Sequence, residues 1–119
     1  MRWKLDKNRP LCPQIEEQIC VLIAKGELTE GDKLFSVREV AVGAGVNPNT
    51  VQKAFEALEI NGLIYSVRGS GWYVTDSKEK AVQIVNELTE SKTKAYFEEM
   101  KLLGLGVDQI KEFVKEFEI

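Results

Sequence analysis

The chain contains no histidine and only two cysteines among its 119 residues. Without histidine it lacks the commonest general base and the catalytic triads that depend on one. Cys12 and Cys20 are eight positions apart and form no Cys-x-x-Cys motif, so a zinc site would need more soft ligands than this chain offers. We therefore expect two reduced thiols packed as small apolar side chains. We expect no metal, no cofactor and no enzymatic activity.

Long apolar runs are also missing. No stretch approaches the roughly 20 apolar residues that a membrane-spanning helix needs. The charged first ten residues contain no apolar segment of the kind found in a signal peptide. These features predict a cytoplasmic protein with no membrane partner.

Positive charge is in short supply as well, since the net charge is −3. Residues 1–76 carry nine Lys and Arg against ten Asp and Glu, and residues 77–119 carry seven against nine. Nucleic-acid-binding domains are often basic, so a nucleic-acid contact here would depend on local cations such as Arg38, Lys53 and Arg68. The acidic total predicts weak non-specific binding and a modest dependence on salt.

The most informative segment, residues 36–71, has the pattern of two helices around a tight turn. Ser36 with Glu39 three residues later is a capping box that starts the first helix, and a glycine-rich turn ends it. Asn47 followed by Pro48 is a strong start for the second helix, predicted over residues 48–61.

A hairpin is predicted to follow these helices. Residues 63–67 and 72–74 have the composition of strands, and the glycine-containing loop between them suits a tight turn with Arg68 at its cationic tip. Two helices and a hairpin in this order outline a winged helix-turn-helix. The predicted fold class is therefore mostly α with a small β-hairpin wing (α+β).

The segments on either side complete the predicted organisation. Trp3 and Leu5 alternate with polar residues in an N-terminal arm, which suggests a short strand. Pro13 suits the first position of the helix that follows. After the wing, apolar residues recur at three- and four-residue steps over residues 78–103, and Asp108 can cap a last short helix. We expect a DNA-binding domain over 1–76 and a helical tail over 77–119.

The apolar stripe of the tail allows two interpretations. A long helix cannot bury its own stripe, so the stripe either packs on the preceding domain or forms a seam between two copies of the chain. We favour the dimer, because two half-sites double the DNA contacts and would lie ~10 bp or a multiple apart. The candidate dimerisation residues are Ile84, Leu88, Tyr96, Met100 and Leu103.

Motifs at fixed spacing carry a family resemblance over residues 10–74. This segment resembles the N-terminal domain of GntR-type bacterial transcription regulators, and the tail resembles the YtrA-type branch, in which two C-terminal helices replace a large ligand-binding domain. The resemblance implies a sequence-specific homodimer, usually a repressor, on a double-stranded DNA operator; a small-molecule effector is not indicated. The motifs include Ser36-x-Arg38-Glu39-x-Ala41, Gly45-Val46, Asn49-Thr50-Val51, Gly62-Leu63-Ile64 and Arg68-Gly69-x-Gly71.

The chain departs from the family pattern at a few positions. Cys12 stands where Tyr is usual, Phe35 where Pro is usual and Trp72 where Thr is usual, and the turn around Gly43 is richer in glycine. These differences affect packing and helix entry more than function.

The resemblance also assigns DNA-contact roles. Arg38 matches an arginine that contacts the DNA backbone, and Arg68 with Gly69 matches a wing tip that reaches the minor groove. Asn can pair with adenine and Thr can touch phosphate or the thymine methyl, whereas we expect Asn47 only to cap its helix. The predicted DNA-binding residues are Arg38, Asn49, Thr50, Gln52, Lys53, Arg68 and Gly69.

A second class of function fits the acidic charge: a winged-helix module that binds protein and not DNA. The polar start of the second helix and the cationic wing favour DNA, because a purely protein contact would need neither of these features. Retention on a heparin column at low salt separates the two classes.

Overall fold

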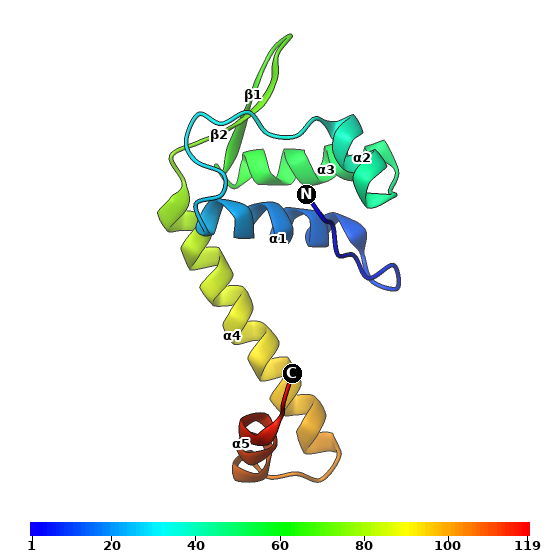
Figure 1. Ribbon diagram of the computed structural model, residues 1–119, viewed down its shortest axis with the longest axis vertical. Helices are drawn as coiled ribbons and strands as arrows, with labels where there is room; N and C mark the ends of the chain where they lie inside the picture. The colour runs from blue at the N-terminus through cyan, green and yellow to red at the C-terminus, as the bar shows by residue number, and fades with distance from the viewer. The chain divides into compact units, whose positions relative to one another are not determined.

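The computed structural model describes all residues, 1–119, and contains five helices and one hairpin. Strands β1 and β2 pair antiparallel with Tyr65 opposite Tyr73. Figure 1 shows the hairpin rising beyond helices α1 and α3, with α2 at the opposite end of α3. The predicted fold class is confirmed. In chain order the elements are α1 (Leu11–Ala24), α2 (Val37–Ala44), α3 (Pro48–Ile60), β1 (Ile64–Val67), β2 (Gly71–Val74), α4 (Lys78–Leu102) and α5 (Val107–Glu116).

The chain divides into two units, Met1–Val85 and Asn86–Ile119, with the boundary inside α4. The first turns of α4 therefore belong to the N-terminal unit, where Ala81 is fully buried in the core. The predicted division of function at residues 76 and 77 stays a prediction. No helix in the structure combines the length and the apolar composition that crossing a bilayer requires.

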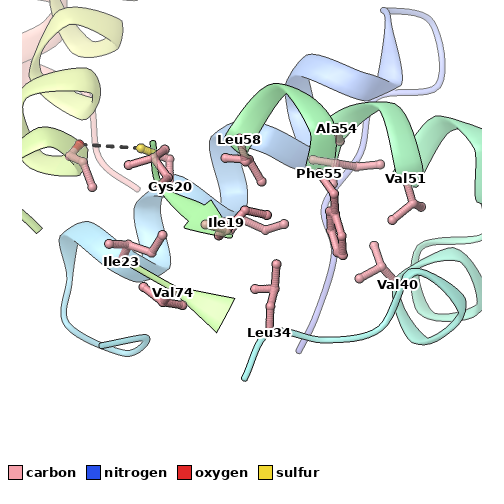
Figure 2. Close-up of a cluster of buried hydrophobic side chains, with 14 of the residues drawn as sticks. Ile19, Cys20, Ile23, Leu34, Val40, Val51, Ala54, Phe55, Leu58 and Val74 are labelled. Atoms are coloured by element: carbon pink, nitrogen blue, oxygen red, sulfur yellow. Dashed lines mark hydrogen bonds between the residues drawn. The ribbon is translucent and has the colours of Figure 1, made fainter. Parts of the chain in front are cut away.

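The N-terminal unit has one hydrophobic core, to which α1, α2, α3 and the hairpin all contribute. Phe55 on α3 is fully buried and meets the Trp72 ring edge-to-face, with 5.6 Å between ring centroids. In Figure 2 the side chains of Ile19, Leu34 and Val40 converge on the same interior. Each fully buried side chain of this size contributes ~1.5–3 kcal/mol, so α3 is held firmly by its apolar face.

The N-terminal arm forms no strand, contrary to the prediction from Trp3 and Leu5. Gln18 accepts a hydrogen bond from the Lys4 N–H at 3.2 Å and donates to the Lys4 carbonyl at 2.6 Å. Gln14 likewise accepts a hydrogen bond from the Asp6 N–H at 2.7 Å and donates to the Asp6 carbonyl at 2.9 Å. Two amide side chains one helical turn apart thus satisfy the backbone groups that a neighbouring strand would have satisfied.

Two predicted helix starts need correction. Helix α1 begins at Leu11, after Pro10, so Pro13 is its third residue, where an N–H would still lack an intrahelical partner. Helix α5 begins at Val107, so Asp108 is a first-turn residue and not the cap. The Gly106 N–H donates instead to the Gln109 side-chain oxygen at 2.9 Å.

A short segment before α2 extends the wing. The Gly31 N–H donates to the Val74 carbonyl at 2.9 Å, and the Leu34 N–H donates to the Trp72 carbonyl at 2.8 Å. The Val74 N–H in turn donates to Asp32. The outer edge of β2 is therefore paired with backbone, and this pairing fixes the base of the wing next to the entry to α2.

The C-terminal unit buries far fewer apolar side chains than the N-terminal unit. Ile110 on α5 is fully buried, and Phe97 and Met100 on α4 are half-buried. Figure 1 shows α5 folded back beside the end of α4. Leu88 is half-buried as well, whereas many other large apolar side chains of this unit are exposed, among them Leu102, Leu103, Phe113, Val114 and Phe117.

Candidate nucleic-acid interface

Local features that the sequence predicted set both ends of α2 and the start of α3. The Ser36 hydroxyl accepts from the Glu39 N–H, and the Glu39 carboxylate accepts from the Ser36 N–H, each at 3.0 Å. Gly45 ends α2 with a φ of +67°, a conformation that favours glycine. The Asn47 side chain then accepts from the Asn49 N–H at 2.8 Å and caps α3.

Helix α3 separates its faces clearly. Val51, Ala54, Phe55 and Leu58 are buried, whereas Asn49, Gln52 and Lys53 are exposed and Thr50 is half-buried. The Gln52 amide donates to Glu56 one turn later at 3.3 Å, so this amide must leave Glu56 before it can reach a base edge. The predicted contact residues of α3 thus lie on its outward faces, and its apolar face is fully used by the core.

Arg38 lies in the first turn of α2, and it is exposed and outside every salt bridge in the chain. A cation is disfavoured at this end of a helix by the helix dipole, and an external phosphate would offset that cost. The neighbouring Glu39 is an anion whose pKa is lowered, first by the hydrogen bond from the Ser36 backbone and then by the Ser36 side chain. The Glu39 carboxylate accepts the Ser36 N–H hydrogen bond that caps α2.

The wing tip consists of Arg68, Gly69 and Ser70. The Ser70 N–H donates to the Val67 carbonyl at 2.9 Å and closes the turn, and the Ser70 and Tyr73 hydroxyls hydrogen-bond to each other. Gly69 has a φ of +78°, and a Cβ there would meet no other atom of the chain within 4 Å. Glycine is thus required by the backbone conformation, and the space around it is open to an approaching ligand.

The predicted dimerisation residues differ in their surroundings. Ile84 packs against the core of the N-terminal unit, as in the intramolecular alternative considered for this stripe. Leu88 and Met100 are half-buried, Tyr96 is 40% exposed and Leu103 is 76% exposed. Sequence reasoning named no residue of the last helix for the interface. The apolar repeat there predicts a stripe that includes Phe113, Val114 and Phe117, and the structure shows that these three side chains are exposed.

Both cysteines are free thiols, with Cys12 half-buried and Cys20 buried. Cys12 donates to the Glu16 carboxylate at 3.4 Å, and burial, followed by that hydrogen bond and the Glu16 charge, raises the pKa of its thiol to about 11. Cys20 is buried against α4, with its sulfur 3.6 Å from the Ala81 carbonyl oxygen, and burial raises its pKa too. Both shifts favour the neutral thiol over the thiolate, which is the nucleophilic form.

Three features together define a winged helix-turn-helix DNA-binding domain. Helix α3 buries its apolar face and exposes a polar start, the capped helix α2 precedes it, and a hairpin with a cationic tip follows it. Residues 11–74 match the family described as bacterial regulatory proteins, gntR family. The chain belongs to that family, and it is of the YtrA type. It is a transcription regulator with a DNA-binding domain.

Known relatives agree with this placement. The HTH-type transcriptional repressor YtrA of Bacillus subtilis is 36% identical over 92% of this chain and 85% of its own. A GntR family transcriptional regulator from Listeria monocytogenes is 38% identical, with a TM-score of 0.80 over 96% of this chain and 100% of its own. The AraR DNA-binding domain, solved in complex with operator ORE1, is 30% identical, with a TM-score of 0.55 over 63% of this chain and 94% of its own.

Proposed function

We propose that the protein is a cytoplasmic homodimeric repressor that binds a palindromic operator, with α3 in the major groove and the wing in the minor groove. The observation that carries this proposal is the exposed polar start of α3, together with two exposed cations that have no ion-pair partner in the chain, Arg38 on α2 and Arg68 at the wing tip. The AraR complex with its operator and the repressor role in the name of YtrA support it. Repression would follow from occluding a promoter.

The proposed contacts divide by chemistry. Arg38 and Lys53 bind phosphates, which position the domain on the duplex. Asn49 and Gln52 read base edges, and each good bidentate pair with adenine contributes ~1–3 kcal/mol of discrimination. These side chains account for specificity in a chain whose net charge is negative.

Three remaining residues complete the proposed interface. Thr50 is the third residue of α3 and is half-buried. Its hydroxyl contacts a phosphate, or its methyl group packs on a thymine methyl. Arg68 enters the minor groove at the wing tip. Gly69, which has no side chain to hold the backbone away, lets the tip approach the groove closely.

The exposed apolar side chains of the C-terminal unit support the dimer. Leu103 is 76% exposed and Phe117 is 72% exposed. Apolar side chains on neighbouring helices of one small unit are typical of an interface. We propose that a second copy covers them, together with Leu88, Tyr96 and Met100, and that the DNA half-sites lie ~10 bp or a multiple apart.

Selection of bound sequences from a random pool of duplex DNA tests the proposal. The expected result is an enriched inverted repeat, and sedimentation of the complex should show two chains on each duplex. The same pool selected with an Asn49→Ala variant should lose enrichment at the adenine position that Asn49 reads. Failure to enrich any sequence would favour the protein-interaction module.

A further inference from the structure

The outer edge of β1 is hydrogen-bonded by a side chain from α3. The Ser66 N–H and the Ser66 hydroxyl both donate to Glu59 Oε2, at 3.1 Å each. The Thr75 N–H donates to the Leu63 carbonyl, so the alternation of antiparallel pairing turns the Ser66 N–H away from β2. The Glu59 carboxylate thus occupies the place that a third strand would take on this edge.

The two edges of the wing are held in different ways. The edge of β2 is paired with the backbone of Asp32 and Leu34, which no side-chain substitution removes. The edge of β1 is held by the Glu59 carboxylate, which a single substitution does remove. A substitution at Glu59 can therefore change how this edge of the wing is held without altering the backbone pairing of β2.

Glu59 also connects the two elements that we propose enter the DNA grooves. It lies in the last turn of α3, the helix whose start carries Asn49 and Lys53. Its partner Ser66 lies two residues before Arg68 at the wing tip. From this connection we infer that Glu59 is a positioning residue, which holds the wing so that Arg68 reaches the minor groove while α3 occupies the major groove. The inference rests on the proposed function of the wing.

The bond contributes more to binding geometry than to folding. Glu59 and Ser66 are both exposed, so water can replace the lost acceptor and the stability cost is small. Without the bond the wing samples other orientations, and ordering it on the DNA lowers affinity. Loss of the Glu59 negative charge has the opposite effect on DNA affinity, because removing an acidic side chain near phosphates strengthens binding.

The experiment compares Glu59→Ala with Glu59→Gln on the selected operator. Both variants lose the charge, but glutamine keeps a side-chain oxygen that can accept both hydrogen bonds from Ser66. We expect the alanine variant to bind about threefold or more weakly than the glutamine variant, with similar melting temperatures. Ser66→Ala keeps the Glu59 charge and loses one of the two bonds, so it should bind more weakly than the wild type.

Two further measurements separate positioning from a general effect. Hydrogen exchange of the Ser66 amide without DNA should be faster in Glu59→Ala than in Glu59→Gln. Arg68→Ala should reduce affinity by a smaller factor in the Glu59→Ala background than in the wild type, because residues that act as one unit are not additive.

Equal affinities of the alanine and glutamine variants, or the same Arg68 factor in both backgrounds, would overturn the inference while leaving the proposed function intact. If Arg68→Ala does not change the affinity in the wild-type background, the wing does not contact the DNA. The proposed function of the wing is then wrong, and so is the role inferred for Glu59.

Discussion

The two units of the chain differ in how they satisfy their apolar side chains. The N-terminal unit buries a continuous core from α1 to the first turn of α4, with Phe55 near its centre. The C-terminal unit fully buries Ile110 and leaves large apolar side chains such as Phe113 and Phe117 in solvent. The first unit covers most of its large apolar side chains within the chain, whereas the second leaves several of them exposed, and we propose that a second copy covers these. Stability and assembly should therefore respond to different substitutions.

The largest expected effect is in the core of the N-terminal unit. Phe55→Ala removes a fully buried ring that packs against Trp72, and it should destabilise the chain by about 3–5 kcal/mol. Urea unfolding followed by circular dichroism measures this loss. Phe113→Ala, measured at a concentration at which the chain is monomeric, is the matched control, because the same truncation at an exposed site should cost the single chain little. Equal losses at the two sites would contradict the difference between the units.

The next effect concerns assembly. Phe117→Asp places a charge on the exposed apolar face of α5 and should weaken dimerisation by tenfold or more, since burying an unpaired charge costs several kcal/mol. Sedimentation equilibrium measures the dimer dissociation constant. Ile60→Asp is the control, because Ile60 is 85% exposed but belongs to the N-terminal unit. If both variants dimerise like the wild type, the seam lies elsewhere.

Local signals in the sequence identified much of the N-terminal unit. The Ser36 and Glu39 pair and the Asn47 and Pro48 pair each act within four residues, so the caps of α2 and α3 were predicted correctly. The inward stripe of α3 follows from helical spacing alone. The outward residues of α3 follow from the same spacing, whereas the DNA-contact roles of Arg38, Arg68 and Gly69 rest on the family resemblance.

Contacts between distant residues could not be predicted in this way. The alternation of Trp3 and Leu5 indicated a strand, but the backbone there is bonded by Gln14 and Gln18 from a helix. The backbone pairing of Leu34 with Trp72 on β2 also joins residues far apart in the sequence, so no local pattern predicts it. In the tail, periodicity gave the stripe but could not show that Ile84 packs on the winged-helix core.

DNA binding should respond to substitutions that leave both units folded. Arg38→Ala and Arg68→Ala should each weaken operator binding severalfold or more, with little change in melting temperature, because both side chains are exposed. Gel-shift titration at fixed salt measures the affinity. Lys25→Ala is a control that removes a cation outside the predicted interface. Unchanged affinity in both arginine variants would contradict the docking arrangement.

The smallest effect is the contribution of Glu39 to the cap of α2. The pKa of Glu39 is lower in the folded chain than in the unfolded one, so its contribution is present above the unfolded value of about 4.3. This contribution is lost as pH falls through the folded value. Glu39→Ala should therefore be less stable than the wild type at pH 7, and the gap should narrow as the pH is lowered below 4.

Urea unfolding at several pH values measures this gap, with Ser36→Ala and Glu112→Ala as comparisons. Ser36→Ala removes the hydroxyl acceptor of the cap and should cost ~0.5–2 kcal/mol even at pH 7. Glu112→Ala removes an exposed carboxylate from α5 and should leave the stability of the N-terminal unit unchanged at every pH. A gap for Glu39→Ala that stays constant down to pH 3 would show that the ionised carboxylate does not hold the cap. In that case the helix entry beside Arg38 would depend on Ser36 alone.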